Sequence, residues 1–153
     1  MREKIQNEIF NFFPPSICNA NEITDSIVDN AQEIRFRVGH PINIRMNSTD
    51  IFIGNAITQE GILKTLENFS DKSIYAVQSE LNCGYITIRG GHRIGISGTC
   101  IIEDGKVKNL KYISSLNIRI AREVKNCSEI LFKYIMLKEE FNNTLIISPP
   151  RMW

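Results

Sequence analysis

Residues 33–46 read Glu33-Ile34-Arg35-Phe36-Arg37-Val38-Gly39-His40-Pro41-Ile42-Asn43-Ile44-Arg45-Met46. Apolar residues alternate with charged or polar ones on both sides of Gly39-His40-Pro41, whose composition is typical of a turn. Successive side chains of a β-strand point to opposite faces of the sheet, so the alternation predicts two strands. The stretch therefore predicts a β-hairpin with one apolar face and one basic face.

Helical patterns precede this hairpin. Residues 3–13 place apolar side chains at helical spacing, and Pro14-Pro15 would end that helix because proline lacks a backbone donor. Residues 20–31 predict a second helix, with one apolar face made of Ile23, Ile27, Val28 and Ala31. After the hairpin, residues 51–53 predict a short further strand.

Two more helices are expected after this strand. Thr58 can cap a helix that begins at Gln59, because its hydroxyl can accept a hydrogen bond from the first turn. Ser70 or Asp71 can cap another helix, and Gly84 supplies its C-terminal stop.

A second β region follows these helices. Alternation predicts strands over residues 85–89, 93–102 and 116–120, with turns at Gly90-Gly91 and at Glu103-Asp104-Gly105. Three strands joined by tight turns form an antiparallel meander. Two glycines inside the middle strand predict a bulge or a close approach of another backbone, and they are Gly95 and Gly98.

The C-terminal part predicts one more helix and one more strand. Asn126 and Glu129 have the spacing of a capping box at a helix start. Residues 143–147 form an apolar run that is typical of a strand buried on both faces of a parallel sheet. The expected fold class is α+β: N-terminal helices, a β-hairpin, a helical pair, an antiparallel meander, a further helix and this last strand. We expect residues 1–141 to form a domain, and residues 142–153 to begin another.

Composition fits one globular domain. The 153 residues are 42% hydrophobic and 23% charged, and the formal net charge is +1, so overall charge predicts no polyanion partner. The four cysteines include no C-x-x-C pair and there are only two histidines, so we expect no zinc site. No signal peptide and no membrane span are expected, which favours a reduced cytoplasmic protein with mostly buried thiols.

The last residues resemble the first half of a phosphate-binding loop. Such a loop needs a buried strand, a glycine-rich turn, and then Lys and Ser or Thr at a helix start, where backbone N–H groups hold phosphate. Leu145-Ile146-Ile147 followed by Ser148, Pro149 and Pro150 could supply the strand and the beginning of the turn. The Gly-Lys-Thr half is absent and Trp153 stands at the second glycine position. Judged alone, this run is more simply an edge strand and a tail.

Arginines are the other candidate site residues. Arg89, His92 and Arg93 flank Gly90-Gly91, and we interpret this stretch as a hairpin turn with an exposed basic tip, not a nucleotide loop. A further set is predicted on polar strand faces or just after them: Arg35, Arg37, Arg45, Arg119 and Arg122. Such arginines usually form a solvated face, but several converging on one surface could bind phosphate, since the guanidinium fork matches phosphate oxygens.

Three blocks together resemble one known family. They are residues 33–41, residues 90–98 and residues 114–123, the last reading Ser-Ser-Leu-Asn-Ile-Arg-Ile-Ala-Arg-Glu. In this order they resemble the stage III sporulation protein AA family, ATPase-like proteins of endospore formers. In that family the third block leads through a helix into an Asn-Thr-Leu-Ile-Ile-Ser-Pro-Pro strand, which residues 143–150 match closely.

The resemblance implies a particular architecture. The family is similar to the ATPases of type II and type IV secretion systems, in which an N-terminal α/β domain precedes a RecA-like core and hexameric rings form. Residues 142–153 would then be an orphan strand and the truncated P-loop of a missing core. The implied partners are that core, a possible homo-hexamer, and the sporulation channel proteins at the membrane, on the mother-cell side of the forespore in the cytoplasm.

The same resemblance implies roles for some residues. Arg119 and Arg122 would help to hold nucleotide in the full-length assembly, and Ser148, Pro149 and Pro150 would begin its P-loop. ATP and Mg²⁺ would belong to the full-length relative. We expect no cofactor, no metal, no catalytic residue and no ATP hydrolysis here, because the Lys and the acidic Mg²⁺ and catalytic residues are absent. The departure at the P-loop indicates an expressed fragment, or a gene with a premature stop or a frameshift.

Three functions remain open from the sequence. The favoured one is an N-terminal assembly or regulatory domain of such an ATPase, serving the mother-cell-to-forespore channel during endospore formation. The alternative is a single-stranded nucleic-acid-binding module that uses Arg35, Arg37, Arg45, Arg89 and Arg93, although the near-zero net charge makes nucleic acid an unfavoured partner. The third is a truncated product without a role.

Overall fold

The structure is a computed structural model that describes residues 2–70, 77–123, 126, 128–137, 140–145 and 147. The chain divides into two compact units, Met1–Ala121 and Arg122–Trp153. The expected boundary between residues 141 and 142 stays a prediction.

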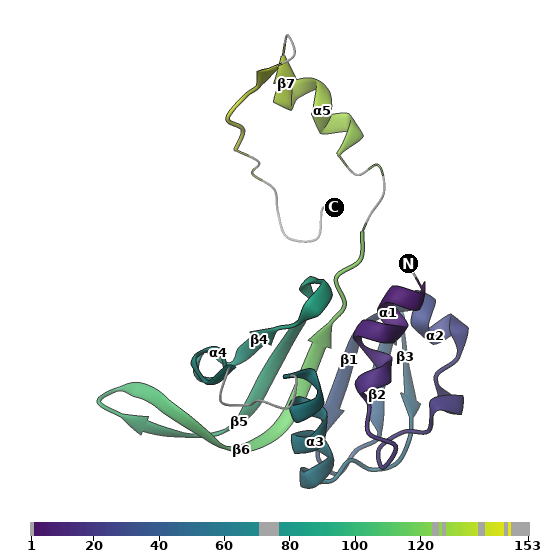
Figure 1. The fold of residues 1–153 in the computed structure, drawn as a ribbon, viewed down its shortest axis with the longest axis vertical. Coiled ribbons are helices and arrows are strands. Elements are labelled where there is room, and N and C mark those ends of the chain that lie inside the picture. The colour runs from purple at the N-terminus through teal and green to yellow at the C-terminus, as the bar shows by residue number, and fades with distance from the viewer. Residues whose placement is uncertain are drawn as a thin grey trace. The chain divides into compact units, whose positions relative to one another are not determined.

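The first unit is built on a six-stranded antiparallel sheet with the strand order β3-β2-β1-β6-β5-β4 (Figure 1). The strands are β1 (Ala31–Arg37), β2 (Ile42–Met46), β3 (Thr49–Ile53), β4 (Tyr85–Thr87), β5 (Arg93–Glu103) and β6 (Lys106–Arg119). The β1–β2 hairpin and the β4–β5–β6 meander are both confirmed. The last strand of the meander lies between β1 and β5, so it joins the two predicted β regions into one sheet.

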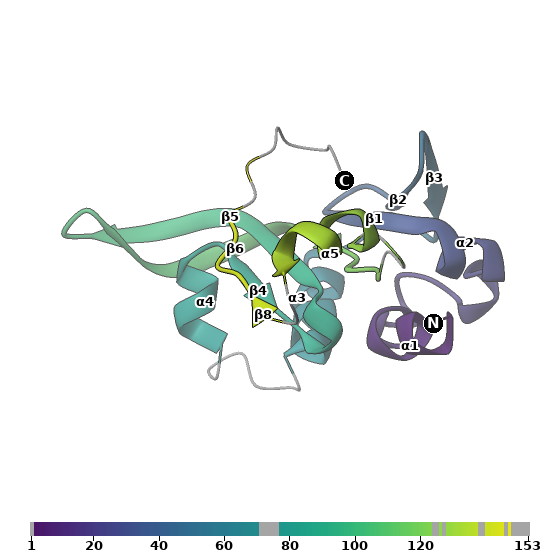
Figure 2. The ribbon, with the colours of Figure 1, turned by 90° about the horizontal axis from the view of Figure 1, so that it is seen from above.

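Helices cover one face of this sheet. They are α1 (Arg2–Glu8), α2 (Asp25–Asn30), α3 (Gln59–Phe69) and α4 (Gln78–Asn82), with short 3-10 turns at Phe10–Phe12, Ala20–Glu22 and Arg89–Gly91. Figure 2 shows α1, α3 and α4 on the same side of the strands. The alternation of the strands explains this, since every second residue is buried against the helices, as with Ile34 and Phe36 in β1. The core also takes Ile9, Phe13 and Leu66 from the helical layer.

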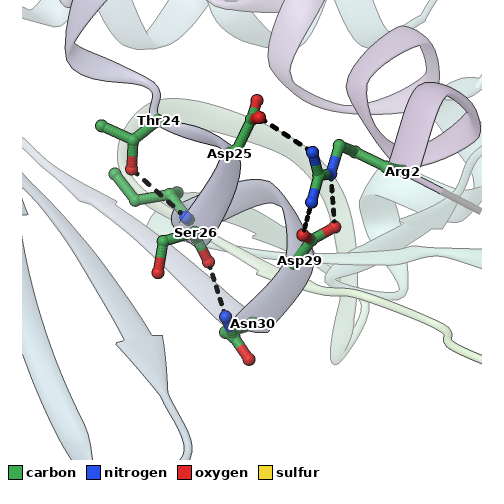
Figure 3. A network of polar contacts seen from close by, with 7 residues as sticks. Arg2, Thr24, Asp25, Ser26, Asp29 and Asn30 are labelled. Atoms are coloured by element: carbon green, nitrogen blue, oxygen red, sulfur yellow. Dashed lines mark hydrogen bonds and ion pairs between the residues drawn. The ribbon is translucent and has the colours of Figure 1, made fainter.

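Local signals in the sequence set several element ends. The Thr58 hydroxyl accepts a hydrogen bond from the Gly61 amide at 3.0 Å, so the predicted cap of α3 is confirmed. The carboxylates of Asp25 and Asp29 both bind the Arg2 guanidinium, which ties α1 to α2 (Figure 3). Gly84 follows α4 at φ +82°, a conformation that favours glycine.

Other expectations differ from the structure. The helix expected over residues 20–31 is a 3-10 turn followed by α2, and Ala31 already begins β1. The last strand of the meander begins at Lys106 instead of residue 116, because three bulges break its alternation and hide it in the sequence. The second helix of the expected pair, α4, begins at Gln78, and its proposed caps include Asp71, which lies outside the described residues.

The second unit contains α5 (Glu129–Ile135), β7 (Met136–Leu137) and β8 (Glu140–Phe141). The predicted capping box is wrong, because Asn126 has φ +64° and the residue before α5 is Ser128. The rings of Phe132 and Phe141 meet edge to face, with centroids 6.4 Å apart. Residues 142–145 belong to no strand, and the Asn142 amide donates to the Ile135 carbonyl at 2.8 Å at the end of α5. The α+β fold class is confirmed.

Candidate functional site

The face of the sheet opposite the helices gathers the predicted strand arginines. Cross-strand register places Arg45, Glu33, Arg119 and Arg93 in one row over β2, β1, β6 and β5. Their neighbours along the strands, such as Ile34 and Ile118, are fully buried on the helical side, so this row lies on the open face. Arg35 and Arg37 of β1 lie on the same face in the next two rows. The convergence that the sequence left open is therefore present.

Part of this positive charge is neutralised within the sheet. Arg35 donates to Glu33 at 2.6 Å and to Asn43 at 3.3 Å, and its guanidinium lies 3.8 Å from Asp50. Partial burial alone would raise the pKa of Glu33, but hydrogen bonds from Arg35 and Asn117 and the nearby positive charges outweigh it, so the pKa of Glu33 is lowered. Directly opposite pairs also place Arg45 beside Glu33 and Asp50. The β1–β2–β3 side of the face is thus nearly balanced.

The β5–β6 side carries two opposed arginines. Arg93 and Arg119 are directly opposite across the strands and both are exposed. The Arg93 guanidinium lies over the Tyr85 ring, 3.8 Å from its centroid, which fixes it on the open face. Like charges in directly opposite positions are destabilising, and the described residues give neither arginine an ion pair within 4 Å. Glu33, directly opposite Arg119 on its other side, attracts that arginine at longer range and leaves Arg93 the less compensated of the two. Two guanidinium groups held together in this way form a suitable site for a phosphate or another oxyanion.

The row next to this pair leaves space beside the two arginines. In the next row, Gly95 lies opposite Asn117 and has no side chain of its own, and the nearest heavy atom to an added Cβ would be 3.8 Å away. The Asn117 side chain has a buried Oδ1 with no hydrogen-bond partner among the described residues. Gly95 therefore leaves room beside the arginine pair, whereas the Asn117 oxygen is an acceptor and would not donate to an anion.

His92 is not part of an exposed basic tip, which corrects one prediction. Its side chain is 1% exposed, and its Nδ1 accepts a hydrogen bond from the Ala121 amide at 2.9 Å. Its Nε2 lies 3.2 Å from Glu8 Oε2 in α1. The turn itself is confirmed, since Arg89–Gly91 is a 3-10 turn with Gly90 at φ +85°. His92 follows that turn and points into the structure, so it positions the end of β6.

The remaining predicted residues are distributed as follows. Arg89 is exposed in the turn between β4 and β5 and lies outside the strand rows. Arg122 is the first residue of the second unit and belongs to no helix or strand, so the structure does not group it with Arg119. Ser148, Pro149 and Pro150 lie outside the described residues. The nucleotide roles predicted for Arg119, Arg122, Ser148, Pro149 and Pro150 stay predictions.

The described part of the chain offers no group of three or more His, Cys, Asp or Glu side chains that could hold a metal ion. Among its helices, none is long and apolar enough to cross a bilayer. Cys18 is buried, and burial with the nearby Glu22 charge raises the pKa of its thiol to about 11. Cys83 is exposed, so the expectation of mostly buried thiols fails at that position.

Sequence reasoning missed the neighbours of the arginines. Glu33, Tyr85 and Asn117 were predicted only as members of strands, and Gly95 only as a bulge or a close backbone approach. Alternation does place all four on polar faces, but only the register of non-consecutive strands brings them together. Knowing that β1 pairs with β6 would have placed Glu33 and Asn117 beside the arginines.

The sequence also matches a known protein family. The family model for sporulation stage III, protein AA, matches residues 3–153, which is nearly the whole chain. The chain belongs to this family. The three blocks that carried the resemblance now have places in the fold: the β1–β2 hairpin, the turn into β5, and the end of β6 with the residues after it.

A curated relative and a solved structure are also similar. Stage III sporulation protein AA of Bacillus subtilis (strain 168) is 39% identical over 146 residues, covering 95% of this chain and 47% of the relative. The chain therefore spans about half the length of that relative. The VirB11 ATPase of the Brucella suis type IV secretion system, solved in complex with sulphate, is 14% identical with a TM-score of 0.38, covering 79% of this chain and 35% of that one.

Proposed function

We propose that this chain is the N-terminal assembly or regulatory domain of a stage III sporulation protein AA-like ATPase. Two things support the proposal. The family model covers almost the whole chain, and the curated relative is about twice as long. The first unit also has an open sheet face whose surplus positive charge lies at Arg93 and Arg119. In this proposal the face meets phosphate groups of a nucleotide bound by the ATPase core.

The opposition of Arg93 and Arg119 is the observation that carries the proposal. A pair of exposed like charges contributes nothing favourable to folding by itself. Guanidinium groups bind phosphate oxygens through parallel N–H donors, and such charge-assisted hydrogen bonds are among the stronger ones. An arginine pair that is unfavourable for the isolated fold but suited to an oxyanion is what a binding site requires.

The chain alone should not hydrolyse ATP. Phosphoryl transfer needs a lysine on the phosphates, a bound Mg²⁺ and a group that positions water. The measurement is release of inorganic phosphate from Mg²⁺-ATP by the purified chain. Release that survives repurification and requires the metal would overturn this part of the proposal.

A phosphate titration tests the face directly. We expect the backbone and arginine side-chain NMR signals of Arg93 and Arg119 to shift on addition of pyrophosphate, and the shifts to shrink in Arg119→Gln. Arg45→Gln is the matched control, since it removes one charge from the same row next to the acidic side chains. If both variants lose binding equally, general charge attraction explains the effect and the specific site is wrong.

The assembly part of the proposal is tested in full-length protein. Arg93→Gln and Arg119→Gln should lower the ATP hydrolysis rate, while Arg45→Gln should leave it near the parental rate. The ring would be a homo-hexamer serving the mother-cell-to-forespore channel from the cytoplasm of the mother cell. A fluorescent fusion in sporulating cells should collect at the mother-cell side of the forespore membrane, and a diffuse signal throughout sporulation would contradict that location.

A single-stranded nucleic-acid module is the second candidate. Five arginines converge on the open face, and the next row carries Phe52 and Tyr85 at its two edges, where bases could stack. Glu33 and Asp50 lie on the same face and argue against this function, because their negative charges would repel a phosphate backbone. Binding of a labelled single strand at low salt, with affinity falling steeply as salt rises, would support this function. No gel shift at low salt would exclude it.

A further inference from the structure

The β5–β6 hairpin extends beyond the rest of the sheet as a two-stranded arm, which we define as residues 97–112. β4 pairs only with Arg93–Gly95 of β5, and β1 pairs only with Ser115–Arg119 of β6. Figure 1 shows the hairpin projecting past both neighbours. In the described part of the chain, the two arm strands therefore pair only with each other. The β6 strand of the arm is supported by α4, whose Gln78 side chain donates to Asn109 at 3.1 Å, whereas β5 beyond residue 96 has no second strand partner among the described residues. A two-stranded ribbon is at best marginally stable in water, so a third strand on the β5 edge would stabilise the arm.

One edge of the arm is protected against such pairing. The register with β5 shifts three times, and each shift leaves one extra residue on β6. Partners move from Ser115 to Ile113, from Tyr112 to Leu110 and from Asn109 to Val107, which leaves Ser114, Lys111 and Lys108 as the extra residues. Lys111 and Lys108 lie within the arm, whereas Ser114 lies just outside it and its carbonyl accepts from the Val38 amide. Bulges and edge lysines are the usual means by which proteins prevent edge-to-edge association. The β6 edge combines both.

The other edge has no such protection. Residues 97–102 of β5 read Ser-Gly-Thr-Cys-Ile-Ile, with no charged residue, no proline and no extra residue in the register. Ile101 is 41% exposed and Ile102 is 63% exposed. An uncharged, apolar edge strand is a template for pairing with another strand. The two edges of this hairpin thus differ: the β6 edge is protected against pairing with another strand, and the β5 edge is open to it.

We propose that the β5 arm edge pairs with the same edge of a second copy of this chain, antiparallel and centred on Ile101. The argument for a second copy is self-complementarity. In this register Ile101 meets Ile101, Cys100 meets Ile102, and Thr99 meets Glu103, so apolar residues face apolar ones and no like charges meet. The two arms then form one four-stranded ribbon across a two-fold axis. This inference stands independently of the proposed function.

Cross-linking tests the pairing geometry. Cys83, Cys100 and Cys127 are first replaced by serine in the full chain, leaving buried Cys18 in place. Ile101→Cys is then compared with Asn109→Cys, the residue directly opposite on the protected edge. A residue on the two-fold axis meets its own copy at about 4.5–5.5 Å between Cα atoms, within disulfide range. Under mild oxidation we expect a covalent dimer for Ile101→Cys only.

Association in solution supplies the second readout. Light scattering of the parental chain over a concentration series should show a monomer–dimer equilibrium. Ile101→Lys should weaken the dimer by about tenfold or more because it places like charges directly opposite each other. Asn109→Lys adds the same charge to the other strand and should leave the dimer unchanged. Circular dichroism of both variants checks that each remains folded.

The cross-linking and association results together decide whether the β5 edges of two copies pair. A covalent dimer through position 101, with loss of association only in Ile101→Lys, supports it. A parental chain that stays monomeric at every concentration overturns it. Equal cross-linking through position 109, or open-ended aggregates in place of a dimer, also overturns it, because the contact would then be neither specific to the β5 edge nor closed.

Discussion

His92 Nε2 lies 3.2 Å from Glu8 Oε2, although 84 residues separate the two side chains. The other ring nitrogen, Nδ1, accepts the Ala121 amide hydrogen at 2.9 Å, so the ring proton belongs on Nε2, where it can be donated to the carboxylate. One buried imidazole thus connects α1, the turn before β5 and the last residue of the first unit. The two histidines of the chain have opposite environments, since His40 is exposed in the β1–β2 turn.

His92→Ala should destabilise the first unit by about 1–3 kcal/mol, because it leaves the half-buried Glu8 carboxylate and the Ala121 amide without their partner. The measurement is urea unfolding followed by circular dichroism. His40→Ala is the control and should change the free energy of unfolding by less than about 0.5 kcal/mol. Equal effects of the two changes would show that the imidazole contacts contribute little.

Glu33 should make the fold sensitive to acid. Its pKa is lower in the folded chain than its ordinary value of 4.5, despite partial burial, because hydrogen bonds from Arg35 and Asn117 favour the charged form. The carboxylate therefore adds stability above pH 4.5, and this stability is lost as the pH falls through the folded-state pKa. NMR titration of the Glu33 carboxyl measures that pKa.

Arg35→Gln should raise the pKa of Glu33, since it removes the hydrogen bond that Arg35 donates to Glu33 at 2.6 Å. Arg37→Gln removes an arginine from the same face of the same strand without touching Glu33, and it should move that pKa much less. A Glu33 titration that is unchanged in Arg35→Gln would contradict the arrangement of charges on the open face.

The two glycines of β5 should respond differently to alanine. A Cβ at Gly98 would collide with the carbonyl of Tyr112, so Gly98→Ala must move backbone and should cost about 1–3 kcal/mol. A Cβ at Gly95 would find its nearest neighbour at 3.8 Å, so Gly95→Ala should change stability by less than about 0.5 kcal/mol. Thermal unfolding of the two variants compares them directly, and equal melting temperatures would disprove the close approach.

Arg93→Gln should separate folding from binding. The change removes one of two opposed like charges but also the contact with Tyr85, so the free energy of unfolding should move by less than about 0.5 kcal/mol. Affinity for pyrophosphate should fall by about tenfold or more, because one of two charge-assisted donors is lost. A large loss of stability with unchanged affinity would make Arg93 a structural residue.

Local patterns predicted the pieces of this fold better than their assembly. The hairpin of residues 33–46 follows from alternation, and the α3 cap follows from Thr58, because both depend on a few neighbouring residues. The place of β6 between β1 and β5 depends on contacts between residues about 80 positions apart, which no local pattern encodes. The three bulges also removed the alternation that would have marked residues 106–115 as a strand.

The candidate site shows the same division. Each arginine of the open face was predicted on a polar strand face, but only the register could show that Arg93 and Arg119 are opposite each other. The prediction that His92 is exposed was wrong because a histidine beside Gly90-Gly91 is typical of an exposed turn. Its hydrogen bond with Ala121 depends on β6 lying next to β5, which the local sequence does not show. The run at 143–147 has the composition of a buried strand, and composition alone does not supply the neighbours that a strand needs.

The central position of β6 has a mechanical consequence. The strand that leads out of the first unit is held by ladders on both sides, to β1 and to β5, and both ladders are antiparallel. A pull on the chain beyond Ala121, directed along β6, would load both ladders in shear at once instead of opening them one hydrogen bond at a time. An edge strand would peel under the same force. The unit is therefore built as a firm anchor for whatever follows it.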